Sequence, residues 1–273
     1  MVVFPAAKIN LGLYVTNRRE DGYHNIETLF YPIGFSDILE VVPVPDGPSG
    51  TIDLTLSGAS VEGSLGTNLV VRSYDMLNER KRLPGVRAYL HKCIPTGAGL
   101  GGGSSDGASM LKVLIALFGL DVPPDEIVEL ALALGSDCPF FLDPQPSYAH
   151  GRGEILEHAS ITLRGYYLQL FHPGTGISTA AAYKHVQIGQ PEVSVGELEK
   201  IPIKGWREVV KNVFEPYAFM QQPVIEQIKY RLYESGALFA SMTGSGSAVY
   251  GLFDCETEIP HDLMPYFIWK ERL

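Results

Sequence analysis

A run of glycines in the first half of the chain is the segment whose residue types most directly indicate chemistry. From Pro95 to Asp106 the sequence reads PTGAGLGGGSSD, with five glycines in seven residues. Such a run exposes backbone N–H groups that no side chain covers, and the apolar pattern after it predicts a helix whose positive end lies at the same place. A flexible turn is the alternative, but a turn gains nothing from so much glycine and loses backbone entropy on folding. The segment therefore predicts a phosphate-binding loop.

Two well-known phosphate-binding patterns fit this loop poorly. The letters GAGLGG from Gly97 match the dinucleotide fingerprint, which also requires an acidic residue about 20 positions further on, at the end of a second strand. Asp121 has nearly that spacing but stands between two predicted helices. A P-loop requires Lys-Ser or Lys-Thr after the last glycine, and neither pair follows here. We therefore expect a third kind of phosphate loop, in which Ser104 and Ser105 supply hydroxyls to phosphate or to a magnesium ion.

Two other segments carry polar side chains suited to phosphoryl transfer. Lys8 and Asn10 alternate with apolar residues in a predicted strand, so both side chains lie on one face. Asp137 stands in a loop after a predicted helix. An Asp near a Lys stays ionised and can accept a hydroxyl proton, while the Lys stabilises developing negative charge. The alternative interpretations are a helix cap ahead of Pro139 for Asp137 and a solvated strand residue for Lys8.

The elements that position these residues follow from hydrophobic periodicity and from Gly and Pro signals. Period-two alternation predicts strands, and a 3.6-residue period predicts helices. The helix after the glycines is expected to be capped by one of residues 104–106 and to end at Gly119. We expect strands near residues 8–15, 38–44, 52–56, 86–93, 166–172 and 248–253, and helices near 68–80, 108–118, 125–134, 206–219 and 224–235. This mixture predicts an α+β fold with two lobes and a boundary near residues 150–165.

Composition and charge exclude several classes of protein. The chain has 273 residues, 45% of them hydrophobic, and only 3 Cys, which is typical of a globular protein and not of a disordered chain or a disulfide scaffold. The formal net charge of −10 and the lack of a Lys/Arg cluster argue against a nucleic-acid or membrane partner. The sequence has no signal-peptide pattern and no membrane-length apolar run, so a cytoplasmic location is expected. The Cys and His spacings indicate no metal site, and no obligate protein partner is evident.

Three segments, spread from residue 5 to residue 247, together resemble one known family. PTGAGLGGGSSD is similar to the Pro-x-x-x-Gly-Leu-Gly-Ser-Ser loop of the GHMP kinases, which act on small molecules such as galactose, homoserine and mevalonate. PAAKINL at Pro5 and MTGSGS at Met242 resemble that family's first and third motifs. The resemblance implies a two-lobed fold with an N-terminal domain over 1–157 that carries the ATP loop, a C-terminal α/β domain over 158–273, and an active site in the cleft between the lobes. It also implies a left-handed β-α-β crossover, against the usual right-handed rule.

Within the family, three further segments resemble the branch whose substrate is a cytidine diphosphate-linked sugar alcohol. They are DGYH at Asp21, GSDCPFF at Gly135 and GRGE at Gly151, although Cys138 stands where this branch has an aliphatic residue. The resemblance implies phosphorylation of the 2-hydroxyl of that small molecule in non-mevalonate isoprenoid biosynthesis, with ATP as phosphoryl donor and Mg²⁺. Another GHMP kinase, acting on homoserine or a mevalonate, and a catalytically silent nucleotide-binding module are the alternatives.

The resemblance also implies the residues that handle ATP and the reaction. Lys8 and Asp137 would be catalytic, and Asn68 would lie near adenine. The residues expected to bind the ATP phosphates are Pro95, Thr96, Gly97, Ala98, Gly99, Leu100, Gly101, Gly102, Gly103, Ser104 and Ser105.

A second implied group of residues binds the other substrate. Asn10 would contact its sugar-alcohol end. Tyr23 and Tyr183 would stack on cytosine, while His24 would bind the polar edge of the base. Tyr183 stands where the family commonly has Phe, and a core position is the alternative for this side chain.

Overall fold

The chain folds as two compact units that interleave along the sequence. The computed structural model describes residues 1–61 and 63–273. Unit 1 comprises residues 1–7, 34–96 and 101–144, and unit 2 comprises residues 8–33, 97–100 and 145–273. A single boundary at residue 157 does not separate the units, because segment 8–33 and four residues of the glycine-rich loop pack with the C-terminal part of the chain. The compact units therefore differ from the expected domains 1–157 and 158–273.

Helices and strands are mixed in both units, which confirms the predicted α+β class. The elements of unit 1 are β1 (Val2–Val3), β4 (Ile38–Pro43), β5 (Ile52–Gly58), η1 (Leu65–Thr67), α1 (Leu69–Lys81), β6 (Val86–Lys92), α2 (Gly102–Phe118), α3 (Pro124–Leu134) and η2 (Cys138–Leu142), where η marks a 3-10 helix. Those of unit 2 are β2 (Ala6–Arg18), β3 (His24–Ser36), β7 (Ser147–His150), β8 (Ile155–His158), β9 (Tyr167–Phe171), α4 (Thr179–His185), η3 (Val195–Lys200), α5 (Ile203–Val209), α6 (Glu215–Gln221), α7 (Pro223–Glu234), β10 (Phe239–Met242), β11 (Val249–Phe253), η4 (His261–Tyr266) and β12 (Phe267–Arg272). The start of β2 and the end of β3 belong to unit 1.

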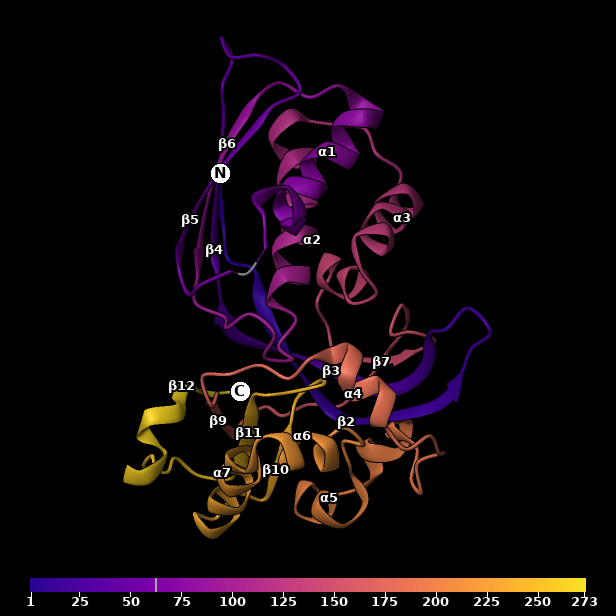
Figure 1. Cartoon of the computed structure of the whole chain (residues 1–273), viewed down its shortest axis with the longest axis vertical. Coiled ribbons are helices and arrows are strands. Elements are labelled where there is room, and N and C mark those ends of the chain that lie inside the picture. The colour runs from indigo at the N-terminus through magenta and orange to yellow at the C-terminus, as the bar shows by residue number, and fades with distance from the viewer. Residues whose placement is uncertain (62) are drawn as a thin grey trace. The chain divides into compact units, whose positions relative to one another are not determined.

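Unit 1 is a four-stranded sheet with helices packed on it. The strand order is β1-β4-β6-β5, in which β5 and β6 are parallel and the other neighbours are antiparallel. Buried and exposed residues alternate along β6, so Val86, Ala88 and Leu90 face a core that they share with α1 and α2. In Figure 1, α1, α2 and α3 lie on the same side of this sheet. Because α1 connects β5 to its parallel neighbour β6, the three elements form a β-α-β unit, whose left-handed crossover stays a prediction.

Helix α2 begins inside the glycine run and ends where the sequence predicts. It stops at Gly119, whose φ of 57° is in the left-handed region that glycine tolerates. Its N-cap residue is Gly101, also left-handed with φ of 73°, and no side chain caps the helix. The expected capping by one of residues 104–106 is wrong, because the helix begins earlier, at Gly102. The N–H groups at the start of α2 therefore have no side-chain cap.

Unit 2 contains two four-stranded sheets, of order β2-β3-β7-β8 and β10-β11-β9-β12. The region around residues 206–219 forms two short helices, α5 and α6, because the chain between them makes a bridge from Asn212 to Leu13 of β2. The residues after Phe253 form η4 and then β12, which pairs antiparallel with β9 at the edge of its sheet. Apolar side chains of α6 and α7 and apolar side chains of the sheet strands β9, β10 and β11 together form the core of this part of unit 2.

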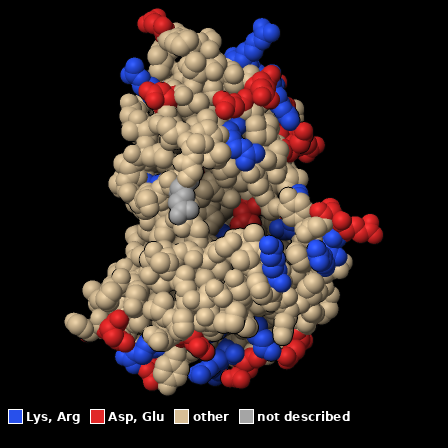
Figure 2. All heavy atoms as spheres, viewed as in Figure 1, with Lys and Arg blue, Asp and Glu red and all other residues tan. Residues whose placement is uncertain are grey.

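Charged side chains of both signs are mixed on the surface. On the face drawn in Figure 2, Lys and Arg atoms are interspersed with Asp and Glu atoms. Among the helices of the described residues, none has the length and apolar content that a membrane crossing needs. The three cysteines are reduced, and Cys138 is buried, Cys93 half-buried and Cys255 exposed.

Candidate active site

Lys8 lies at the centre of a polar cluster in unit 2. Its Nζ donates hydrogen bonds to Asn10 Oδ1 at 2.7 Å and to the carbonyl oxygen of Gly99 at 2.8 Å. The first contact confirms that Lys8 and Asn10 share a face of β2. Lys8 is only 3% exposed, so it is not the solvated strand residue of the alternative interpretation. The ammonium also lies 5.1 Å from the centre of the Phe30 ring, within cation–π range.

Asn10 connects Lys8 to the third motif. Asn10 Oδ1 accepts hydrogen bonds from the backbone N–H of Gly244 at 2.9 Å and from Thr243 Oγ1 at 3.1 Å. Its Nδ2 donates to Thr28 Oγ1 at 2.9 Å. Both ends of the amide therefore hold neighbouring parts of the protein, and Asn10 orients Lys8. Its expected contact with the sugar-alcohol end of the substrate stays a prediction.

The glycine-rich loop and the third motif touch backbone to backbone at Gly99. A Cβ on Gly99 would lie 2.0 Å from the carbonyl oxygen of Thr243, and a Cβ on Gly244 would lie 2.8 Å from Gly99 Cα. Gly99 also has a left-handed φ of 79°. Only glycine allows this approach. Residues of all three predicted motifs therefore meet around Lys8.

The start of α2 exposes one glycine and buries another. Gly103 is exposed, and an added Cβ there would meet no atom within 4 Å. Gly102 is buried, and its Cβ would lie 2.8 Å from Ile94 Cγ2. Ser104 is half-buried, whereas Ser105 is only 2% exposed. Gly103 and Ser104 are therefore open to an anion at this helix N-terminus, and contacts of Gly102 and Ser105 with phosphate stay predictions.

Asp137 stands directly before η2, in unit 1. It occupies the N-cap position of η2 but makes no capping hydrogen bond through its side chain, so the helix-cap interpretation does not account for it. The next residue, Cys138, is fully buried and shares a hydrogen bond with the hydroxyl of Ser104, which joins η2 to the start of α2. Burial raises the pKa of the Cys138 thiol to about 11, so this thiol stays protonated. Lys8 belongs to unit 2, and its pairing with Asp137 stays a prediction.

Two of the three residues expected to bind cytosine, His24 and Tyr183, form an aromatic pair in unit 2. The rings of His24 and Tyr183 stack with centroids 5.1 Å apart and planes inclined by 27°. Rings this close leave no room for a base between them, so a base would stack on an outer face. Tyr183 also meets Phe214 edge-on at 4.9 Å. Tyr23 is 56% exposed, and the guanidinium of Arg152 lies 5.0 Å from its ring centre.

Arg152 is a residue that the sequence analysis passed over. It lies in the GRGE segment, and the resemblance of that segment to a family motif could have identified Arg152 as a site residue. Its charge also acts on Asp21, whose pKa is lowered mainly by the hydrogen bond from the backbone N–H of Tyr23, and further by Arg19 and Arg152. The hairpin end that carries Tyr23 is therefore surrounded by charged groups.

Two residues expected at the ATP site have local structural partners. Asn68 is the N-cap of α1, and its Oδ1 accepts a hydrogen bond from the N–H of Val70 at 2.9 Å. Thr96 Oγ1 donates to the carbonyl oxygen of Ser60 at 3.3 Å. Contacts of Asn68 with adenine and of Thr96 with phosphate stay predictions.

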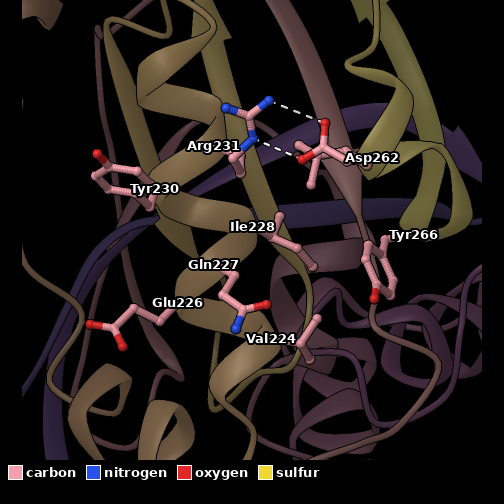
Figure 3. A pocket seen from close by; sticks show the side chains of 9 residues that line it. Val224, Glu226, Gln227, Ile228, Tyr230, Arg231, Asp262 and Tyr266 are labelled. Carbon is pink, nitrogen blue, oxygen red and sulfur yellow. Dashed lines mark hydrogen bonds and ion pairs between the residues drawn. The ribbon is translucent and has the colours of Figure 1, made fainter.

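A pocket of about 580 Å³ lies on unit 2 between α7 and η4, away from these residues. Figure 3 shows that Arg231 of α7 reaches across it to Asp262 of η4, and the two form hydrogen bonds at 2.8 and 3.2 Å. Arg231 also pairs with Glu234. None of the predicted site residues lines this pocket, and the charge of Arg231 is already balanced by Asp262 and Glu234. The pocket is therefore not part of the candidate site.

Comparison with known proteins supports a kinase site. The family description "GHMP kinases N terminal domain" matches residues 68–143, and "GHMP kinases C terminal" matches residues 195–260. A 4-diphosphocytidyl-2-C-methyl-D-erythritol kinase of Parabacteroides distasonis is 44% identical over 275 residues, covering 100% of both chains. A protein of the same name from Bacteroides fragilis is 45% identical over 259 residues, covering 95% of this chain and 94% of the relative.

Solved structures agree with these relatives. A crystal structure of 4-(cytidine 5'-diphospho)-2C-methyl-D-erythritol kinase matches with a TM-score of 0.77 and 36% identity, covering 92% of this chain and 90% of that chain. A homoserine kinase from Cytophaga hutchinsonii matches with a TM-score of 0.63 at 15% identity, which indicates a shared fold only.

Proposed function

Because this chain belongs to the GHMP kinase family, we propose that it transfers the γ-phosphoryl group of ATP to the 2-hydroxyl of 4-diphosphocytidyl-2-C-methyl-D-erythritol, a step of non-mevalonate isoprenoid biosynthesis. One observation carries the reaction type. A buried lysine is held by Asn10 and Gly99 at the point where the glycine-rich loop meets the third motif. The names of the full-length relatives support the substrate.

The side chains of this site match what phosphoryl transfer requires. The open N–H groups at the start of α2 and the glycine-rich loop bind the phosphates. Lys8, oriented by Asn10, stabilises negative charge on the transferred group. Asp137 accepts the proton of the attacking hydroxyl late in the transfer. The contacts of Lys8 with Asn10 and Gly99 exist before substrates bind, so the role of Lys8 is preorganised.

Mg²⁺ fits this arrangement as a partner of the ATP phosphates. Among residues 1–61 and 63–273, no three His, Cys, Asp or Glu side chains form a group that could hold a metal ion. Mg²⁺ prefers oxygen ligands and commonly keeps waters and substrate phosphates in its coordination shell. The hydroxyl of Ser104, on the open side of α2, would supply the protein ligand. When bound, the ion neutralises phosphate charge.

The aromatic groups favour a nucleobase-carrying substrate over the family's smaller substrates. Tyr23 is large, aromatic and exposed, and Arg152 covers one side of its ring. Homoserine and mevalonate carry no base that could stack there. The diphosphate of a cytidine diphosphate-linked alcohol would be attracted to Arg152.

A substrate panel tests the proposal. The purified chain is incubated with MgATP and, separately, the diphosphocytidyl alcohol, homoserine and mevalonate, and ADP formation is measured together with the ³¹P spectrum of the product. We expect turnover of the first compound alone, with a new phosphomonoester at its 2-position. Turnover of homoserine or mevalonate instead would refute the assigned substrate, and no turnover of any compound would favour the silent nucleotide-binding module.

Two variants make this test specific to the site. Asp137→Asn keeps shape but removes the proton acceptor, so kcat should fall by about 100-fold or more while ATP still binds. Tyr23→Ala should raise KM for the cytidine substrate by about 5- to 150-fold, because stacking is worth roughly 1–3 kcal/mol per base, and should leave KM for ATP unchanged. If the KM for ATP rose instead, the two nucleotide sites would have been assigned the wrong way round.

A further inference from the structure

A buried charge cluster in unit 1 lies directly behind the glycine-rich loop. Lys92 Nζ donates to Asp106 Oδ2 at 2.7 Å and to Asp37 Oδ2. Asp37 is 0% exposed, Asp106 3% and Lys92 5%. Neither of the two proposed catalytic residues belongs to this cluster.

The three residues of the cluster connect the strand before the glycine-rich loop to the helix after it. Lys92 is the last residue of β6, and Asp106 lies in the second turn of α2, so their ion pair joins the strand before the loop to the helix after it. Asp37, between β3 and β4, also accepts hydrogen bonds through Oδ1 from the backbone N–H groups of Cys93 at 2.6 Å and Ile94 at 2.9 Å. The chain entering the loop is therefore fixed at consecutive residues.

The ammonium of Lys92 also lies close to the first residue of α2. A Cβ added to Gly102 would be 3.3 Å from Lys92 Nζ. A movement of Lys92 would therefore displace the N–H groups that are proposed to bind phosphate. From this geometry we propose that Asp37, Lys92 and Asp106 form a positioning network that holds the glycine-rich loop in its phosphate-binding conformation before ATP arrives. The inference rests on the proposed function, since it presumes that this loop binds ATP.

An ordinary structural ion pair would explain the cluster less well. Buried ion pairs contribute little net stability, because desolvation offsets the attraction between the charges. Here two carboxylates share one ammonium, and Asp106 Oδ1 has no hydrogen-bond partner among the described residues. Such an arrangement is a poor way to fill a core but an effective way to fix three backbone segments relative to one another.

The experiment separates phosphate binding from overall folding by comparing ATP with adenosine, which lacks phosphates. Asp106→Ala breaks the link between β6 and α2, so the Kd for ATP, measured by calorimetry, should rise about tenfold or more, as expected for loss of a charged hydrogen bond. The Kd for adenosine should stay unchanged. Asp106→Asn keeps an oxygen acceptor for Lys92, so its ATP affinity should remain close to that of the wild type. Ser73→Ala is the matched control. Ser73 Oγ of α1 donates a hydrogen bond at 2.9 Å to the carbonyl oxygen of Gly107, the residue after Asp106 in α2, and does not contact the network.

The Asp106→Asn variant supplies the second measurement and does not depend on the alanine variant folding, because its affinities for ATP and for adenosine should both stay close to those of the wild type. Equal losses of ATP and adenosine affinity in Asp106→Ala would overturn the inference, as would an ATP-specific loss in Asp106→Asn or in Ser73→Ala. If the wild type bound no ATP, the proposed function would fail as well. Intact ATP binding with no effect of these variants would overturn this inference alone.

Discussion

The two units each contain a buried lysine beside the glycine-rich loop, and the contacts described for the two lysines differ. Lys8 donates to two uncharged oxygens, Asn10 Oδ1 and the Gly99 carbonyl. Lys92 donates to two carboxylates, of Asp37 and Asp106. Asn10 and Gly99 orient the Lys8 ammonium where the glycine-rich loop meets the third motif, whereas the two carboxylates on Lys92 link β6 to α2 and to the β3–β4 junction. Lys8 is therefore placed to act on the transferred phosphoryl group, and Lys92 is placed to hold structure.

Removing Lys92 should give the largest effect on stability. Lys92→Met leaves two buried carboxylates without their cation, which typically costs about 3–5 kcal/mol. Urea unfolding followed by circular dichroism measures the loss. Lys8→Met should lose much less, because Asn10 Oδ1 still accepts hydrogen bonds from Thr243 and Gly244. Equal losses would remove the contrast between the two lysines.

Removing Lys8 should give the larger effect on catalysis. Lys8→Met should lower kcat by about 100-fold or more, or roughly 2.7 kcal/mol, because the charge that stabilises the transferred group is lost. ATP affinity should change little, since the phosphates are bound mainly by the loop and α2. Lys8→Arg should not restore activity, because a guanidinium has a different shape and donor geometry from the ammonium that fits between Asn10 and Gly99. Steady-state kinetics with MgATP test all of these expectations, and a nearly active Lys8→Met would show that Lys8 is structural.

Local patterns in the sequence predicted the features that depend on strand alternation and on the residues that end helices. Period-two alternation placed Lys8 and Asn10 on one face, as their 2.7 Å contact confirms. The same period puts Lys92 on the buried face of β6 with Val86, Ala88 and Leu90. That signal could have identified the charge cluster, because a lysine on a buried face needs a partner.

The remaining features depend on contacts between residues far apart in the chain. The contact of Gly99 with Thr243 joins segments 144 residues apart, and no local pattern specifies which glycine meets which backbone. For the same reason the sequence could not tell that Gly102 packs on Ile94 while Gly103 faces open space. The helix start at Gly102 was missed because polar residues 104–106 imitate a cap.

These two adjacent glycines offer a matched test of the two regions. Gly102→Val should destabilise the fold by about 1–3 kcal/mol, since the new side chain would overlap Ile94 and approach Lys92. Gly103→Val adds a side chain where no atom lies within 4 Å, so folding should be nearly unchanged. ATP affinity should nevertheless fall about tenfold, because the branched side chain covers the N–H groups of the helix start. Thermal unfolding and calorimetry separate the two outcomes, and unchanged ATP affinity in Gly103→Val would contradict the phosphate-binding role of this helix start.

The smallest expected effect is a pH dependence of stability that comes from the Lys92 cluster alone. Burial raises the pKa of Asp106 from its ordinary value of 3.8 to about 7 in the folded chain. The attraction of the Asp106 and Asp37 carboxylates outweighs the effect of burial on Lys92 and raises its pKa, so Lys92 stays charged throughout. The folded state therefore binds a proton at Asp106 more tightly than the unfolded state does. The resulting stabilisation is fully present below about pH 4 and is lost as pH rises through about 7.

The pH dependence is measured as a difference between the wild type and Asp106→Asn. From pH 6 to pH 8, the free energy of unfolding of the wild type should fall by about 1.4 kcal/mol more than that of Asp106→Asn, the amount that follows from a folded-state pKa near 7. All other titrating groups are common to both proteins and cancel in the difference. Lys8→Met should keep the wild-type slope, because Lys8 is not among the groups that shift Asp106. If Asp106→Asn showed the wild-type slope, Asp106 would not titrate between pH 6 and pH 8, and its pKa would not lie near 7.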